Sequence, residues 1–135
     1  MIFIVDDTLA FHTKNLKQNY SHYSYFATRL PPGFTDGVVQ NAGSNIYFNP
    51  LIPLSSLQGI HDLQTDLRRI KYGVISVNKA LEDLTCWKTF ALAGRLQKPI
   101  LQLNFQEPNQ ITKQIEEAVT VNRRMALLLA IFMHF

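Results

Sequence analysis

The chain has 135 residues, a mass of 15.5 kDa, and a composition of 47% hydrophobic and 17% charged residues. This length accommodates one domain with a substantial core and excludes a multidomain protein, and the hydrophobic content excludes wholesale disorder. Thirteen Lys and Arg against ten Asp and Glu give a net charge of +3. That excess fits an anionic partner such as a nucleotide or an acidic lipid surface, and equally an ordinary basic domain.

The first predicted element is a β-strand over residues 2–5, whose apolar residues on both faces indicate a central strand. It ends at Asp6 and Asp7, and Asp7 is a candidate N-cap for a helix over about residues 8–20. A cluster with two prolines at 30–33 is expected to interrupt regular structure.

The middle of the chain predicts two further strands. The first covers residues 46–48, closed by Asn49 and Pro50 and followed by a loop over 52–59. Apolar residues at helical spacing predict a helix over 61–70, and a β-branched run predicts a buried strand over 72–77.

The clearest helical periodicity covers residues 79–93, with Gly94 as its candidate C-cap. Cys86, the lone cysteine, lies within it and is expected to be a buried small hydrophobe. A short edge strand is predicted at 99–103, followed by one long helix that starts at 109 or 112. This order of elements predicts a mixed α/β (α+β) domain.

Adjacent carboxylates at the end of a strand are one candidate functional feature. Asp6 and Asp7 are hard oxygen ligands of the kind that Mg²⁺ takes, with substrate phosphates completing its coordination. The alternative is that Asp7 only caps the following helix. No zinc-binding pattern is present.

Two groups of basic and polar residues are candidates for binding phosphate. Arg95 offers a planar fork and Lys98 a point charge just beyond a predicted helix, and Lys71 precedes a predicted strand. The alternative is compensation of the helix dipole. The second group could contact phosphate or transfer protons, or could form a solvated helix face with two surface histidines, and it comprises His12, Lys14, Asn15, His22, Tyr23 and Ser24.

Several ordered blocks resemble the mitochondrial phosphatidate cytidylyltransferase family. They are Ile2–Asp7, the segment from Phe11 to Ser24, Tyr47–Ile52, Ile70–Ser76, Leu81–Trp87 and Ala93–Pro99. The resemblance implies a nucleotidyltransferase-like fold and condensation of CTP with phosphatidic acid into CDP-diacylglycerol and pyrophosphate, with Mg²⁺. It also implies a peripheral protein on the matrix side of the inner mitochondrial membrane that contributes to cardiolipin synthesis and binds no nucleic acid.

Carried over to this chain, the resemblance makes Asp6 and Asp7 the catalytic, metal-binding carboxylates. It makes Lys71, Arg95 and Lys98 candidates for binding the triphosphate or the lipid phosphate. The remaining substrate-binding candidates line the same site, namely His12, Lys14, Asn15, His22, Tyr23 and Ser24.

The chain also departs from the family pattern. Thr8 stands where the family has Pro, and Phe11 where it has Trp. The family's Gly-Ser loop and a further Asp are expected before Met1, and its C-terminal helical domain after Phe135. Residues 1–135 are thus expected to form a partial catalytic domain, truncated at both ends. The 135-residue chain by itself is then expected to bind CTP weakly and to turn it over slowly or not at all. The alternative is a non-catalytic fragment that binds only a nucleotide or a membrane surface.

Overall fold

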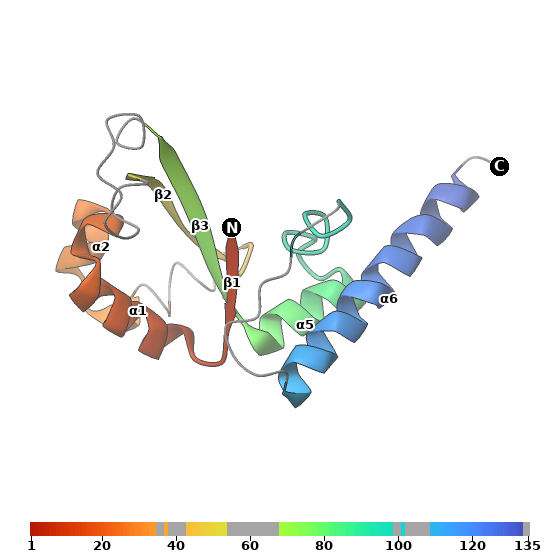
Figure 1. The fold of residues 1–135 in the computed structure, drawn as a ribbon, viewed down its shortest axis with the longest axis horizontal. Helices are drawn as coiled ribbons and strands as arrows, with labels where there is room; N and C mark the ends of the chain where they lie inside the picture. The colour runs from red at the N-terminus through yellow and green to blue at the C-terminus, as the bar shows by residue number, and fades with distance from the viewer. Residues whose placement is uncertain (35–36, 38–42, 54–67, 99–100, 102–108, 134–135) are drawn as a thin grey trace.

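The computed structural model describes residues 1–34, 37, 43–53, 68–98, 101 and 109–133 (Figure 1). The elements, in chain order, are β1 (Ile2–Val5), α1 (Thr8–Gln18), the 3-10 helix η1 (Tyr20–His22), α2 (Tyr25–Arg29), α3 (Pro32–Phe34), β2 (Tyr47–Pro53), β3 (Arg69–Ser76), α5 (Val77–Cys86) and α6 (Gln110–Phe132). Three predicted segments lie largely outside the described residues: residues 61–67 of the helix predicted over 61–70, residues 54–59 of the loop predicted over 52–59, and the strand predicted at 99–103 except Leu101.

The three strands form a mixed sheet in the order β1-β3-β2. β1 runs parallel to β3, with Ile2 opposite Gly73, and β2 runs antiparallel to it. The predicted mixed α/β class is therefore confirmed. The prediction that residues 2–5 form a central strand is wrong, because β3 occupies the centre and β1 an edge of this described sheet. Its residues are accordingly half-buried.

β2 and β3 are both longer than their sequence patterns predicted. β2 continues through Pro50 to Pro53, with an irregular register between Asn49 and Ile52. Proline is tolerated there because β2 lies at the other edge of the described sheet, where a missing N–H breaks no ladder. β3 begins at Arg69, so the end of the segment predicted as helix 61–70 is strand.

Helices cover both faces of the sheet (Figure 1). On one face, α5 and α6 pack a core that includes Ile75, Leu84 and Ile115. On the other face, α1 packs over a smaller cluster centred on Tyr72 and Val74. The alternation of side chains along β3 supplies both cores, which is why its residues 72–75 are all buried.

α5 ends at Cys86, well before the predicted end of the helix at Ala93. Trp87 adopts a left-handed backbone conformation with φ 53° and donates its N–H to the carbonyl of Asp83, so Trp87, not Gly94, terminates the helix. Cys86, at the end of α5, is exposed, contrary to the prediction that it is buried.

α6 confirms the long C-terminal helix, and Asn109 is its N-cap because Asn109 Oδ1 accepts a hydrogen bond from the N–H of Thr112 at 2.9 Å. Its first half packs on α5 through Ile115, Ala118 and Val119. Within the described residues, no helix has the length and apolar character needed to span a membrane.

Candidate functional site

A cleft of about 1080 Å³ runs alongside β1. Its walls come from β1, the start of α1, the segment after α5 and the first turns of α6. Four of the residues predicted to be functional line it, namely Asp6, Asp7, Lys71 and Arg95. The cleft therefore combines carboxylates with basic side chains, as a site for phosphate groups and a divalent cation requires.

Asp6 and Asp7 lie at the junction of β1 and α1, and both are exposed. Asp7 Oδ1 accepts a hydrogen bond from the N–H of Ala10 at 2.9 Å, so Asp7 is the N-cap of α1 as predicted. Capping occupies one carboxylate oxygen and leaves the other carboxylate oxygens of the pair available. This set of hard oxygen donors fits Mg²⁺, which commonly takes one or two protein carboxylates together with phosphate oxygens and water. No cluster of three or more Asp, Glu, His or Cys side chains that could hold a metal occurs in the described part of the chain.

Lys71 and Arg95 converge on the ring of Phe48. Lys71 Nζ lies 5.4 Å and Arg95 Cζ 5.1 Å from the ring centre. Cations are attracted to the face of an aromatic ring, which favours the placement of both side chains near Phe48. The described residues show no salt bridge to either cation. Two cations that lie near one ring and both line the cleft form a candidate phosphate-binding site.

The parallel register separates the two charged ends of the cleft. Val5 lies opposite Ser76, and Lys71 precedes Ser76 by five residues of β3. At about 3.3 Å per residue, Asp6 and Lys71 are roughly 20 Å apart along the strands. One phosphate group cannot contact both, so the cleft suits either an extended polyphosphate or two anionic ligands.

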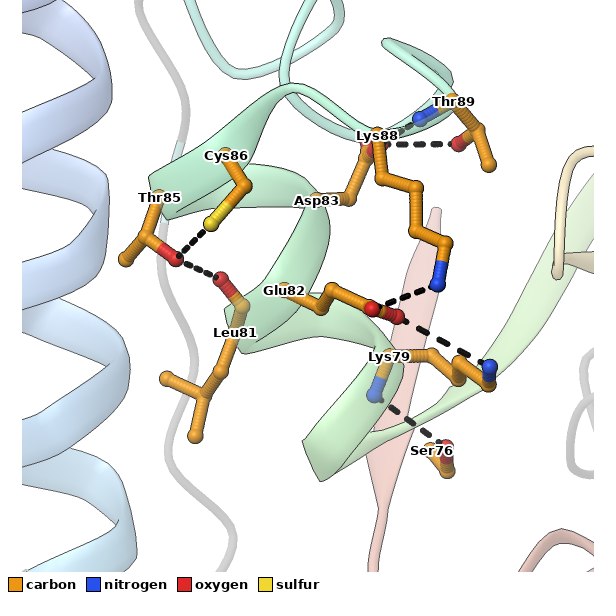
Figure 2. A network of polar contacts seen from close by, with 9 residues as sticks. All are labelled: Ser76, Lys79, Leu81, Glu82, Asp83, Thr85, Cys86, Lys88 and Thr89. Carbon is orange, nitrogen blue, oxygen red and sulfur yellow. Dashed lines mark hydrogen bonds and ion pairs between the residues drawn. The ribbon is translucent and has the colours of Figure 1, made fainter.

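Asp83 organises the segment that carries Arg95. Its carboxylate is 2% exposed and accepts hydrogen bonds from the N–H groups of Thr89, Phe90, Leu92 and Ala93 and from the Thr89 hydroxyl, at 2.6 to 3.0 Å. Figure 2 shows Asp83 beside Thr89, and the neighbouring Glu82 turned toward Lys79 and Lys88 on the surface. Burial alone would raise the pKa of Asp83, but the hydrogen bonds from Ala93, Thr89 and Leu92 outweigh it and hold the pKa below its ordinary value.

Four other predicted residues, three of them buried and Asn15 half-buried, form a hydrogen-bonded network on the α1 face of the sheet. His12 Nδ1 lies 2.9 Å from the Tyr23 hydroxyl, and Asn15 Nδ2 donates to the hydroxyls of Tyr23 at 2.9 Å and Tyr72 at 2.6 Å. His22 Nδ1 lies 3.2 Å from the Tyr72 hydroxyl. The network joins α1 and η1 to the central strand, and none of these four side chains lines the cleft.

Burial controls the proton affinities of this network. It raises the pKa of Tyr23 to about 12, although a hydrogen bond from Asn15 acts in the opposite direction, and it lowers the pKa of His22. Asn49 is also buried, 1% exposed, and its Oδ1 and Nδ2 make no hydrogen bond within the described residues. Both histidines of the network, His12 and His22, are buried. The alternative prediction that they are surface histidines on a solvated helix face is therefore wrong.

The last three predicted residues are exposed and lie apart from the cleft lining. Lys14 lies on α1, and Ser24 is the N-cap of α2, where its Oγ accepts from the N–H of Ala27 at 3.3 Å. Lys98 lines a smaller pocket of about 380 Å³ next to Arg95.

Phe48 and Asp83 carry structural roles that the sequence patterns did not assign. One signal for Asp83 is an acidic residue on the otherwise apolar face of an amphipathic helix, where burial requires hydrogen-bond partners. Phe48 had no comparable signal, because its partners lie on β3 and in the segment after α5.

Comparison with known proteins assigns the chain to a family. The family model described as "Phosphatidate cytidylyltransferase, mitochondrial" matches residues 1–134. Curated proteins of that name are similar to this chain. The one from Mus musculus is 38% identical over 98% of this chain and 35% of its own length. The one from Homo sapiens is 38% identical over 88% of this chain and 25% of its own length. The one from Schizosaccharomyces pombe is 37% identical over 78% of this chain and 24% of its own length. The chain thus spans about a third or less of these relatives. It belongs to the mitochondrial phosphatidate cytidylyltransferase family.

Proposed function

We propose that the protein transfers a cytidylyl group from CTP to phosphatidic acid, which yields CDP-diacylglycerol and pyrophosphate. The observation that supports this most directly is the cleft along β1, with two carboxylates at one end and two cations on one aromatic ring at the other. Two separated charged ends suit a reaction that brings two phosphate-bearing substrates together.

In this reaction an oxygen of the phosphatidate phosphate attacks the α-phosphorus of CTP. A new P–O bond forms, the bond between the α-phosphorus and the bridging oxygen breaks, and pyrophosphate leaves with that electron pair. A phosphate monoester has a second pKa of about 6, so the nucleophile is already mostly a dianion at neutral pH. The main demands on the protein are therefore positioning and charge neutralisation.

Lys71 and Arg95 are proposed to meet that demand. Arg95 can bind two phosphate oxygens with its planar fork, and Lys71 adds a second positive charge near the same ring. Their target is a phosphate group, either of CTP or of the lipid. Lys98 and Lys14 remain candidates for further phosphate contacts.

Asp6, with the uncapped oxygen of Asp7, is proposed to hold Mg²⁺. When bound, Mg²⁺ would neutralise phosphate charge in this cleft. The hydrogen-bonded network of His12, Asn15, His22 and Tyr23 is proposed to support this end of the cleft, because it fixes α1 on the sheet directly after Asp6 and Asp7. Ser24 would contribute by capping α2.

The relatives are named as mitochondrial proteins. We propose that this protein likewise works in mitochondria, as a peripheral protein on the matrix side of the inner membrane, where its product would enter cardiolipin synthesis. Nucleic acid is not among the proposed ligands.

The test is an assay of the full-length protein with labelled CTP, Mg²⁺ and vesicles that contain phosphatidic acid. Stoichiometric formation of CDP-diacylglycerol and pyrophosphate supports the proposal, and GTP serves as the control nucleotide. A folded protein that forms neither product overturns it. Binding of CTP without turnover would instead indicate a role restricted to nucleotide binding.

A further inference from the structure

The segment that carries Arg95 has little regular structure of its own. Residues 87–98 follow α5 as a series of turns, and Arg95 N–H donates to the Leu92 carbonyl at 3.0 Å. The position of its guanidinium group over Phe48 therefore depends on what holds the preceding residues. Those residues hydrogen-bond to Asp83, and Figure 2 shows the contacts of Thr89 among them.

A second buried side chain holds the same segment from the opposite side. Asn122 of α6 is fully buried, donates from Nδ2 to the Ala93 carbonyl at 3.0 Å, and accepts from Trp87 Nε1 at 2.7 Å. Ala93 thus has its N–H bound by Asp83 and its carbonyl bound by Asn122. Arg95 follows two residues later, so its main chain starts from a fixed point.

The backbone of this segment would not keep its shape unaided. Trp87 and Phe90 have φ values of 53° and 59°, in the left-handed region that is unfavourable for bulky residues. Such conformations persist when surrounding contacts enforce them. Here the enforcing contacts are the five hydrogen bonds to Asp83 and the two to Asn122.

We infer that Asp83 is a positioning residue, which together with Asn122 sets Arg95 over Phe48 for phosphate binding. The inference rests on the proposed function, because it takes phosphate as the ligand of Arg95. Asp83 itself is buried and lines no part of the cleft, so it acts only through the segment that it holds.

The experiment compares Asp83→Asn with Glu82→Gln in the full-length protein. Both variants lose one negative charge from adjacent positions of α5, but Glu82 binds only surface lysines. For Asp83→Asn we expect the KM for one phosphate substrate to rise about tenfold, equivalent to one lost phosphate contact of about 1.4 kcal/mol, and kcat to change less. Glu82→Gln should leave both unchanged.

A double-mutant cycle separates positioning from general stability. Asp83→Asn should cost little further affinity once Arg95→Ala is present, because the residue it positions is gone. Equal losses of affinity in the presence and absence of Arg95 would overturn the inference. Should Asp83→Asn fail to fold, Thr89→Val removes only the hydroxyl contacts of Thr89 and should give a smaller loss with the same dependence on Arg95.

Calorimetric binding of inorganic pyrophosphate distinguishes failure of this inference from failure of the proposed function. If the protein shows no turnover but Asp83→Asn and Arg95→Ala weaken pyrophosphate binding equally, the positioning role stands and the proposed function fails. If turnover occurs and depends on Arg95 but a folded Asp83→Asn variant retains it with unchanged KM, the positioning role fails and the proposed function stands.

Discussion

Phe48 lies directly across the β2–β3 pair from Gly73, and its ring occupies the space that a side chain at position 73 would need. A Cβ atom on Gly73 would lie 2.8 Å from Phe48 Cε1 and 2.7 Å from Ile46 Cγ2, closer than such atoms approach in proteins. The glycine thereby leaves room for the Phe48 ring, which lies next to Lys71 and Arg95.

Gly73→Ala should therefore displace Phe48. We expect a loss of about 1 to 3 kcal/mol of stability, typical of overpacking, together with weaker phosphate binding. Thermal unfolding and a CTP titration measure the two effects. Gly33→Ala is the matched control, because a Cβ there meets nothing within 4 Å. Equal behaviour of the two variants would contradict the tight fit at Gly73.

Asp6→Asn should abolish cytidylyl transfer while the protein stays folded. The substitution keeps the size of an exposed side chain and removes the charge proposed to bind Mg²⁺. Product formation from labelled CTP over a range of Mg²⁺ concentrations is the measurement. Glu117→Gln, an exposed carboxylate on α6, is the control and should behave as wild type. Full activity of Asp6→Asn would eliminate the metal-binding role.

Two substitutions at Asp7 should separate helix capping from metal binding. Asp7→Ala loses the hydrogen bond to Ala10 and should cost about 1 kcal/mol, whereas Asp7→Asn can still cap α1 and should cost little. Urea unfolding measures this difference. If only Asp7→Ala lowers activity, capping is what matters; if Asp7→Asn lowers activity without destabilising the protein, the charge is required.

The stability that Asp83 provides should depend on pH. Its pKa is depressed in the folded state, so its contribution is complete above the unfolded pKa of about 4 and is lost as the pH falls through the lower folded value. The difference in unfolding free energy between wild type and Asp83→Asn should therefore shrink from about pH 5 downward. The corresponding difference for Glu82→Gln should be small and sensitive to salt, because that carboxylate is on the surface. A constant difference for Asp83→Asn down to pH 3 would contradict the depressed pKa.

Tyr72→Phe should destabilise the protein by about 1 to 3 kcal/mol. It removes the hydroxyl that Asn15 and His22 both contact and leaves buried polar groups without that partner. Tyr25→Phe provides the control. It removes the same hydroxyl group, but from an exposed side chain on α2, where the hydroxyl is in contact with water. Thermal unfolding of both variants is the measurement, and an equal melting temperature would show that the network contributes no net stability.

Local sequence was sufficient for much of the fold. The β-branched run at 2–5 and the Asp7 cap each act within a few residues, so they predicted β1 and the start of α1 correctly. The same local reasoning extended α5 to Ala93, because helical periodicity continues past Cys86. The helix instead ends at Trp87, and the segment after it is held by the Asp83 carboxylate, which binds N–H groups six to ten residues ahead, a range beyond the spacing of any helical pattern.

By itself, the sequence determined the class of the fold, the carboxylate pair after the first strand and the family to which the chain belongs. Only the tertiary structure decided that β1 is an edge strand of the described sheet, that Lys71 and Arg95 share the Phe48 ring, and that His12 and Tyr23 are buried partners. Pairing between strands and side-chain contacts between distant segments set these features. Their energies depend on which surfaces meet, and a periodicity within one segment carries no information about that.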